Sequence, residues 1–264
     1  MHHALSLPPF GALSDPHVVM DLAAAAESNG WDAVFVWDHL LRPLDQATYI
    51  SDPWITMAAI ATATSRVKIG PMVTPIARRR PLKLAREIAT LDLLSKGRLI
   101  LGLGLGVDSG GELTRTAEEL DPKVRGSMLE EGVRLLDRML RGEHVEHTGT
   151  HFMIDGITLQ PTGAQQPRVP FWLATRGDNL GPVRRAARYE GLAPTVITPD
   201  RFRELVDVVH EARGSLDGFD FALMTTPDHH IDEYEKYGAT WAVHEMKPHH
   251  SIDDIMQVIT TELQ

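Results

Sequence analysis

Along the 264-residue chain, hydrophobic and polar positions follow two patterns in turn. Short runs rich in apolar and β-branched residues are each followed by a longer segment in which apolar residues recur every three or four positions. The first pattern is typical of buried strands and the second of amphipathic helices. The predicted strands lie at residues 4–7, 33–37, 67–73, 99–104, 171–174, 192–194, 219–224 and 240–244.

Each predicted strand leads into a helical segment, which indicates parallel strands joined by crossover helices. Eight such units predict an α/β protein with a (β/α)8 TIM barrel, for which about 250 residues is a typical length. No linker interrupts the series, so we expect one domain over residues 1–264. The main predicted helices lie at residues 16–28, 52–64, 81–94, 122–140, 180–189, 200–213 and 252–262.

Two segments do not follow this repeat. Residues 144–159 alternate between polar and apolar positions as in a β-hairpin, and we interpret them as a small excursion between units four and five. The glycine run at residues 102–106 suggests a different fold, an open doubly wound sheet that binds a dinucleotide. That fingerprint has the spacing G-x-G-x-x-G, whereas Val107 stands where its last glycine would be. The barrel is therefore the favoured fold and the open sheet the alternative.

Composition and charge exclude several classes of protein. A formal net charge of −10 makes binding to nucleic acid unfavourable. The one basic cluster, Arg78-Arg79-Arg80, can hold a cofactor tail or decorate a helix end, and we favour decoration for at least two of its members. The absence of cysteine fits a reducing compartment, so we expect a cytoplasmic protein. No apolar run approaches the roughly 18 residues of a membrane span, and residues 1–10 lack the pattern of a signal peptide.

In a barrel of this kind the active site lies at the carboxyl ends of the strands. Polar or glycine-rich residues follow four of the predicted strands, and we expect them to meet at one barrel mouth and to bind a small-molecule substrate there. These clusters are Trp37-Asp38-His39, residues 71–74, residues 104–108 and residues 175–179.

The last of these clusters stands at a predicted helix start. Free backbone N–H groups and the helix dipole at such a position suit a cofactor phosphate. Thr175 and Arg176 add side-chain donors, and Gly177 of the same turn is a further candidate contact. A simple capped helix start is the alternative.

From end to end the chain resembles the luciferase-like family of flavin- and F420-dependent oxidoreductases. The resemblance follows the order of the predicted units and continues from Asp121-Pro122 onwards. It implies the bacterial luciferase-like form of the barrel and an oxidoreductase that binds FMN or F420. The stretches that carry it are residues 30–39 (GWDAVFVWDH), 66–75 (RVKIGPMVTP), 89–98 (ATLDLLSKGR), 101–104 (LGLG) and 238–241 (GATW).

The resemblance also implies which residues bind the cofactor. Strand three of the family has a bulge, often with a non-proline cis peptide, and Met72–Val73 is the matching pair whose backbone would support one face of the tricyclic ring. From the residues alone, an ordinary strand end is equally compatible. Thr74 and Gly104 are further candidate contacts at this mouth, and Asp108 stands where the family often has an asparagine.

His39 is the leading candidate for chemistry. Its imidazole can donate a hydrogen bond or exchange a proton near neutral pH, although a histidine taken alone is more often structural. In the F420-using branch of the family, the histidine after a similar aspartate sits at the deazaflavin. Asp38 is then expected to orient His39 or to contact the ring edge. Leu105 departs from the family pattern, because it supplies neither the glutamate of F420-dependent dehydrogenases nor the arginine of luciferases.

These observations favour hydride transfer between a flavin-type cofactor, FMN or F420, and a small organic substrate, with monooxygenation as a special case. We expect a homodimer. A metal-dependent TIM-barrel hydrolase is one alternative, since His144, His147 and His151 are spaced like ligands, although they fall in the predicted hairpin and we expect no metal site. A luciferase-like subunit that binds a cofactor without turnover is the other alternative.

Overall fold

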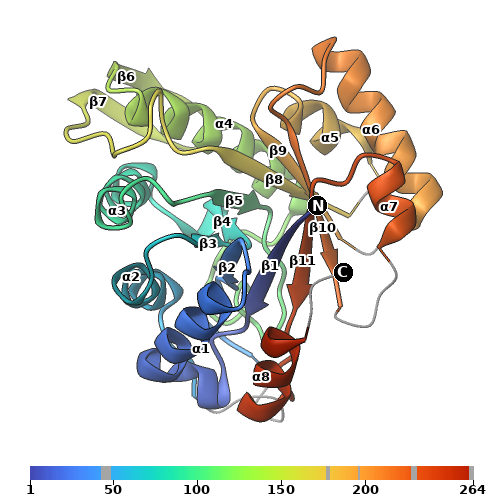
Figure 1. Ribbon diagram of the computed structural model, residues 1–264. Helices are drawn as coiled ribbons and strands as arrows, with labels where there is room; N and C mark the ends of the chain where they lie inside the picture. Colours follow the sequence, from blue (N-terminus) through green and yellow to red (C-terminus); the bar gives the residue numbers. More distant parts are fainter. Residues whose placement is uncertain (43–48, 177–178, 196, 227–230, 262–264) are drawn as a thin grey trace.

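The computed structural model describes residues 1–42, 49–176, 179–195, 197–226 and 231–261. Parallel strands form a barrel and helices surround it (Figure 1). The barrel strands are β1 (His2–Leu7), β2 (Ala33–Val36), β3 (Lys68–Pro71), β4 (Thr74–Pro75), β5 (Leu101–Gly104), β8 (Phe171–Thr175), β9 (Gly191–Pro194), β10 (Asp220–Thr225) and β11 (Trp241–Glu245). The helices are α1 (Pro16–Ser28), α2 (Pro53–Ala63), α3 (Pro81–Leu94), α4 (Pro122–Leu140), α5 (Leu180–Ala186), α6 (Pro199–Arg213), α7 (Asp232–Lys236) and α8 (Ile252–Thr260), with short 3-10 helices η1 (Gly11–Ser14) and η2 (Ile76–Arg78). Among the described helices, none has both the length and the apolar character that crossing a bilayer requires.

The sheet closes on itself through its third strand. β3 pairs with β2, whereas its continuation β4 pairs with β5, so the strand order β3-β2-β1-β11-β10-β9-β8-β5-β4 begins and ends on the same stretch of chain. A parallel bridge between Ile69 and Leu99, and a 2.8 Å hydrogen bond from Ile100 N to Ile69 O, join that stretch to the next strand. With β3 and β4 counted as one interrupted strand, the eight strands of the predicted TIM barrel are confirmed.

Three of the crossover helices begin at an Asp-Pro pair. Asp15, Asp52 and Asp121 are the N-caps of α1, α2 and α4, and a proline follows each of them. Each carboxylate accepts a hydrogen bond of 2.8 to 2.9 Å from a backbone N–H in the first turn. Proline suits the first helical position because the N–H that it lacks would have no partner there. The predicted starts of these helices, at residues 16, 52 and 122, therefore agree with the structure to within one residue.

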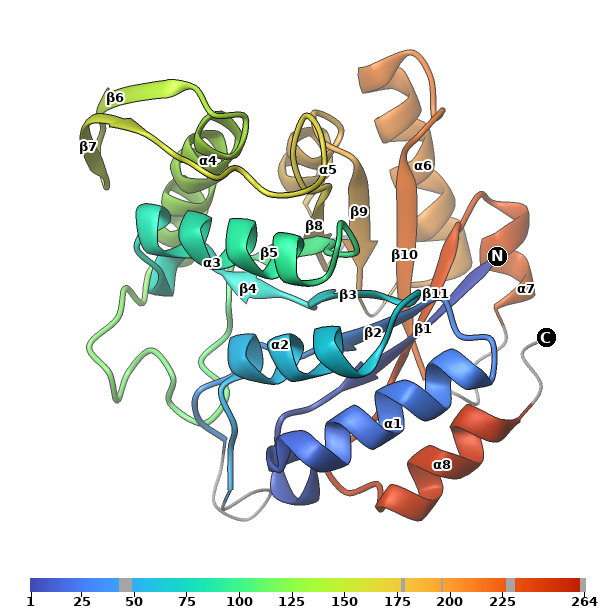
Figure 2. The ribbon, with the colours of Figure 1, turned by 60° about the vertical axis from the view of Figure 1, so that its left-hand side comes forward.

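The predicted excursion between units four and five is confirmed. Strands β6 (His144–Thr148) and β7 (Met153–Thr158) form an antiparallel hairpin that lies beside α4, outside the barrel (Figures 1 and 2). Its buried side chains, Val145 and Ile154, belong to the same apolar cluster as the buried face of α4. The hairpin therefore extends the outer core and takes no part in the barrel sheet.

Large aromatic side chains fill the barrel interior. Phe35, Trp172 and Trp241 pack with ring centroids 5.3 to 6.5 Å apart, and small residues such as Ala4 and Ala222 complete this cluster. Tilted and edge-to-face aromatic pairs of this kind stabilise a core beyond their buried area. A second apolar layer packs the strands against the helices. The interior is a packed core, which leaves the carboxyl ends of the strands as the place for a site.

Two histidines on neighbouring strands are in contact in this outer layer. Nδ1 of His3 on β1 lies 3.1 Å from Nε2 of His244 on β11, and both residues are buried. Burial and the adjacent His3 lower the pKa of His244 from 6.5 to about 4. Burial, together with the charge of the N-terminal amino group, lowers the pKa of His3. The folded protein therefore holds both rings neutral at pH 7.

We expect this pair to make the fold sensitive to acid. Because the pKa of His244 is lower in the folded state than in the unfolded state, the unfolded chain takes up its proton first as the pH falls below about 6.5. The stability that depends on a neutral His244 is complete above that pH and declines toward pH 4, by about 2 kcal/mol at pH 5. Urea unfolding at pH 7.5 and pH 5 measures this loss.

His244→Leu should remove most of the decline between these two pH values. His249→Gln is the matched control, because His249 is exposed, and it should leave the decline unchanged. An undiminished decline in His244→Leu would refute the assignment.

Candidate active site

One cavity of about 1590 Å³ opens at the carboxyl ends of the barrel strands and extends to α4 and α5. The four predicted clusters meet there, as expected for a TIM barrel. Two predicted residues are not part of the described wall: Thr74 lies buried behind it, and Gly177 is outside the described residues. The predicted residues that line the cavity are Asp38, His39, Met72, Val73, Gly104, Asp108, Thr175 and Arg176.

The bulge implied for strand three is present between β3 and β4. The Met72–Val73 peptide bond is cis, and both residues line the cavity. Two glycines of β5 are needed for the bulge to pack. A side-chain carbon on Gly104 would lie 2.5 Å from Val73 Cγ2, and one on Gly102 would overlap the Pro71 carbonyl oxygen. The glycines at 102 and 104 therefore serve close packing against the bulge, which explains their spacing without a dinucleotide fingerprint.

Asp38 is buried at the end of β2, and its carboxylate accepts hydrogen bonds from three side chains. Oδ2 lies 2.8 Å from Thr74 Oγ1 and 3.3 Å from Trp54 Nε1. Arg79 Nη2 donates to both oxygens, at 2.8 Å and 2.7 Å. These contacts tie β2 to the segment after the bulge. Asp38 is thus a buried structural anchor of the mouth, and the orienting contact predicted between it and His39 is made by another residue.

Two of the three arginines of the basic cluster point inward. Arg78 Nη2 donates to the Asp38 carbonyl oxygen at 2.8 Å, and the Arg78 side chain is only 3% exposed. Arg79 is ion-paired with Asp38 and 18% exposed. The prediction that at least two of the three arginines decorate a helix end is therefore wrong, because η2 turns Arg78 and Arg79 toward the barrel. Arg80 alone is exposed, at the start of α3.

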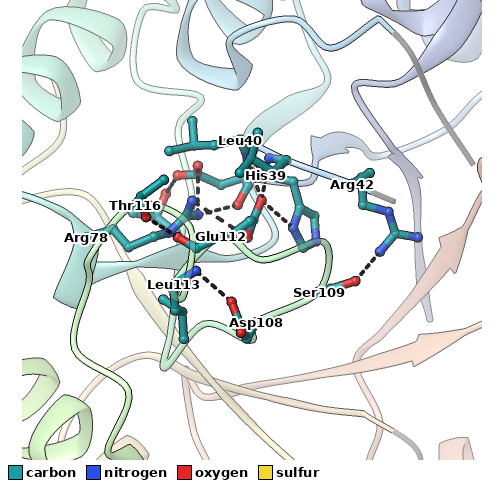
Figure 3. Close-up of polar contacts among 12 residues, drawn as sticks. His39, Leu40, Arg42, Arg78, Asp108, Ser109, Glu112, Leu113 and Thr116 are labelled. Atoms are coloured by element: carbon teal, nitrogen blue, oxygen red, sulfur yellow. Dashed lines mark hydrogen bonds and ion pairs between the residues drawn. The ribbon is translucent and has the colours of Figure 1, made fainter. Parts of the chain in front are cut away.

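His39 contacts Glu112, a residue that the sequence analysis did not select (Figure 3). Nδ1 of His39 lies 3.0 Å from Glu112 Oε1, and the same oxygen accepts hydrogen bonds from the backbone N–H groups of Leu40 and Leu41. Glu112 belongs to the loop between β5 and α4. No periodic pattern marks that loop, so only the folded structure reveals that its carboxylate reaches the end of β2.

Asp108 lies exposed at the edge of the cavity. Its Oδ1 accepts hydrogen bonds from the backbone N–H groups of Leu113 at 2.7 Å and Thr114 at 3.1 Å, and these bonds lower the pKa of Asp108. The side chain therefore caps its own loop, and a contact with a cofactor stays a prediction. Leu105 lines the cavity as an apolar residue, which agrees with the expectation that it supplies neither acid nor base.

At the end of β8, Thr175 and Arg176 line the cavity beside the start of α5. Asn179 caps this helix, because its side chain accepts a hydrogen bond from Gly181 N at 2.9 Å. The phosphate contact predicted for Thr175 and Arg176 stays a prediction.

The cavity wall formed by α4 and α5 is strongly basic. A single carboxylate, Glu130, contacts three arginines, two of which are cavity residues: it pairs with Arg185, with Arg188 at 2.6 Å and with Arg134 at 2.5 Å. Burial by itself would raise the pKa of Glu130, but the three arginines lower it to about 2. Glu130 is therefore an anion at neutral pH. The basic residues of this wall are Lys123, Arg125, Arg184, Arg185 and Arg188.

Each histidine of the hairpin has a partner in the hairpin itself or in α4. His147 Nε2 lies 2.9 Å from Glu131 Oε1, and His151 Nε2 lies 2.9 Å from Ser127 Oγ. In the described ranges, no group of three histidine, aspartate or glutamate side chains is placed to hold a metal ion. The described residues therefore offer no group of metal ligands that would support the metal-dependent hydrolase alternative.

With this geometry established, comparison with known proteins identifies the class. Residues 3–240 match the model of the luciferase-like monooxygenase family, and the chain belongs to that family. It is 31% identical over 245 residues to an F420-dependent glucose-6-phosphate dehydrogenase of Nakamurella multipartita, a match that covers 88% of this chain and 70% of that protein. It is also 29% identical over 161 residues to the oxygenase component of a flavin-dependent trigonelline monooxygenase of Acinetobacter baylyi, covering 61% of this chain and 43% of that protein.

A solved structure agrees on the fold. The coenzyme F420-dependent tetrahydromethanopterin reductase of Methanopyrus kandleri superposes with a TM-score of 0.80 over 99% of this chain and 98% of that one, at 18% identity. At this identity the likeness concerns the fold alone.

Loss of the Asp38 carboxylate should destabilise the whole mouth. We expect Asp38→Ala to lower the free energy of unfolding by about 3 to 5 kcal/mol, because removing one partner of a buried ion pair leaves the other charge uncompensated. Urea unfolding measures the change. Asp21→Ala, on an exposed position of α1, is the matched control and should shift stability by less than about 0.5 kcal/mol. Equal stability of the two variants would contradict the structural role of Asp38.

Proposed function

We propose that this chain is an oxidoreductase that transfers hydride between a flavin-type cofactor, F420 or FMN, and a small organic substrate at the barrel mouth. The observation that carries this proposal is that the two ends of this cavity differ in character. Its barrel end combines the cis Met72–Val73 bulge with His39, and its outer end is the basic wall of α4 and α5. A cofactor with a planar apolar ring and an anionic tail matches these two ends, the ring at the barrel end and the tail at the basic wall.

The residues present fit such a cofactor. Trp37, Met72, Val73, Leu105 and Ala174 offer an apolar surface at the barrel end, where a tricyclic ring would bury its faces. The arginines of the basic wall suit a phosphate or carboxylate tail. In a protein with a net charge of −10, the excess of cations is local to this wall, where five basic residues face the single carboxylate of Glu130.

The cofactor, the apolar wall and His39 would each have a separate role in the reaction. When bound, the cofactor supplies the two-electron hydride chemistry. The apolar wall limits the access of water to the reacting carbon. His39, 18% exposed at the cavity, presents a ring nitrogen that can exchange a proton with a substrate oxygen.

F420 is the favoured cofactor, because the match to an F420-dependent dehydrogenase covers 88% of this chain, against 61% for the flavin-dependent monooxygenase. Monooxygenation with FMN is the second candidate. It is supported by Leu105, an apolar residue at the cavity position where the resemblance implies the glutamate of F420-dependent dehydrogenases. The proposal includes a homodimer as the working form, and the cysteine-free composition supports a cytoplasmic location.

Cofactor titration tests the proposal directly. Purified protein is titrated with F420 and with FMN while cofactor fluorescence is followed. We expect saturable binding of at least one of them, F420 more tightly, and weakening of that binding by about tenfold or more in the double variant Arg185→Gln, Arg188→Gln, because each charged hydrogen bond contributes about 1.5 to 3 kcal/mol. The double variant Arg66→Gln, Lys68→Gln, at the amino end of β3 and away from the cavity, is the charge-matched control. If neither cofactor binds, the proposed function fails.

His39→Ala should separate binding from turnover. We expect this variant to bind the cofactor as the wild type does and to reduce turnover by about 10² to 10⁴-fold, the usual contribution of a proton-transfer group. Reduction of F420 by 2-propanol or by glucose-6-phosphate, followed by absorbance, provides the assay. His17→Ala, exposed at the start of α1, is the control. Unchanged turnover in His39→Ala would remove His39 from the mechanism.

A further inference from the structure

Glu112 is buried directly beside His39. Its side chain is 2% exposed, and Oε1 accepts hydrogen bonds from two backbone N–H groups, Leu40 N at 2.5 Å and Leu41 N at 2.9 Å. His39 Nδ1 lies 3.0 Å from the same oxygen. Figure 3 shows this carboxylate between His39 and Arg78. The contacts join the loop after β5 to the residues that follow β2, so Glu112 controls the local geometry on both sides of His39.

The carboxyl group of Glu112 is ionised. Burial alone would raise its pKa, but the hydrogen bond and charge of His39, the Leu41 N–H and the charge of Arg78 lower it. Arg78 Nη1 lies 3.6 Å from Glu112 Oε2, and both side chains are at most 3% exposed. A buried carboxylate with a cation beside one oxygen and two backbone N–H donors on the other is well compensated.

An ionised carboxylate can only accept hydrogen bonds. The hydrogen between Glu112 Oε1 and His39 Nδ1 must therefore belong to the histidine. In the neutral imidazole only one nitrogen bears hydrogen, so the other, Nε2, has a free lone pair. Within the described residues Nε2 has no hydrogen-bond partner, and the ring lines the cavity.

We propose that Glu112 is a positioning residue that holds His39 as the tautomer with hydrogen on Nδ1, so that Nε2 accepts the proton of a substrate hydroxyl. This inference rests on the proposed function. When an alcohol is oxidised, its O–H bond breaks and the proton moves to Nε2. The neighbouring C–H bond breaks and its hydrogen leaves with both electrons to the oxidised cofactor, while a C=O bond forms. Glu112 then faces the positive charge that His39 gains.

Ring-nitrogen shifts of His39 test the tautomer without any cofactor. Long-range proton–nitrogen correlation spectra of the ¹⁵N-labelled full chain are recorded at about pH 8.5, where histidines are normally neutral. His39→Gln identifies the signals that belong to His39. We expect Nδ1 to be the protonated nitrogen in the wild type, Nε2–H to predominate in Glu112→Ala, and Nδ1–H to be retained in Glu112→Gln, whose amide oxygen can still accept from the ring. Hydrogen on Nε2 of His39 in the wild type would overturn the proposal.

Turnover then tests the function of this tautomer. With F420 and whichever of 2-propanol and glucose-6-phosphate the wild type oxidises, we expect kcat to fall by on the order of tenfold or more in Glu112→Ala with KM changed less than about threefold. Glu112→Gln should lose less, and Glu119→Gln, an exposed change in the same loop, should behave as wild type. Wild-type kcat in Glu112→Ala would overturn the role of Glu112.

The two hypotheses fail in different ways. If the protein binds neither F420 nor FMN, or oxidises neither 2-propanol nor glucose-6-phosphate, the proposed function fails for these cofactors and substrates. The nitrogen shifts of His39 still decide the tautomer in that case. If Glu112→Ala does not fold, the wild-type spectrum decides the tautomer, and Glu112→Gln compared with the wild type decides whether the Nδ1–H signal and kcat change together. A loss of kcat in Glu112→Gln equal to that in His39→Ala, with Nδ1–H intact, would overturn the tautomer as the reason for the effect.

Discussion

The ion pair between Asp38 and Arg79 is the contact on which the barrel mouth depends. It joins the end of β2 to the segment after β4, and both oxygens of the carboxylate take part. Arg78, from the same segment, continues the chain of charges to Glu112, which reaches His39. Each buried carboxylate thus faces a guanidinium group, which is the condition under which buried charge is tolerated. The His39 side chain is thus held at the end of a chain of two buried carboxylates and two guanidinium groups at the wall of the cavity.

On the β5 side, the barrel mouth depends on two glycines, which have no side chain. At Gly102 and Gly104 of β5 a single added carbon would collide with the bulge of the neighbouring strand. The bulge, in turn, is what interrupts β3 and β4 and turns Met72 and Val73 to the cavity. Close backbone packing on one side and buried charge on the other give this end of the cavity a rigid frame, which suits the binding of a planar ring.

Much of the fold could be predicted because the responsible signals are local and repeated. Alternating strand and helix patterns determine the eight units, and the Asp-Pro pairs mark three helix starts. The cis bulge followed from resemblance, since no local pattern distinguishes Met72–Val73 from an ordinary strand end. Glu112 could not be predicted, because its function depends on where an irregular loop returns to the barrel. Arg78 and Arg79 were misinterpreted for a similar reason: their position before Pro81 suggests a helix end, whereas a short 3-10 turn directs them inward.

Glu130 gives the basic wall of the cavity an internal counter-ion. With a pKa of about 2 it keeps its negative charge at any physiological pH, and it already pairs with Arg185 and Arg188. An anionic group at these arginines would therefore compete with Glu130 for the same N–H donors, and its net gain would be the difference between the two sets of contacts. Discrimination between anions at such a wall would depend on how well their oxygens match the fork of the guanidinium groups, because charge alone is already supplied by Glu130.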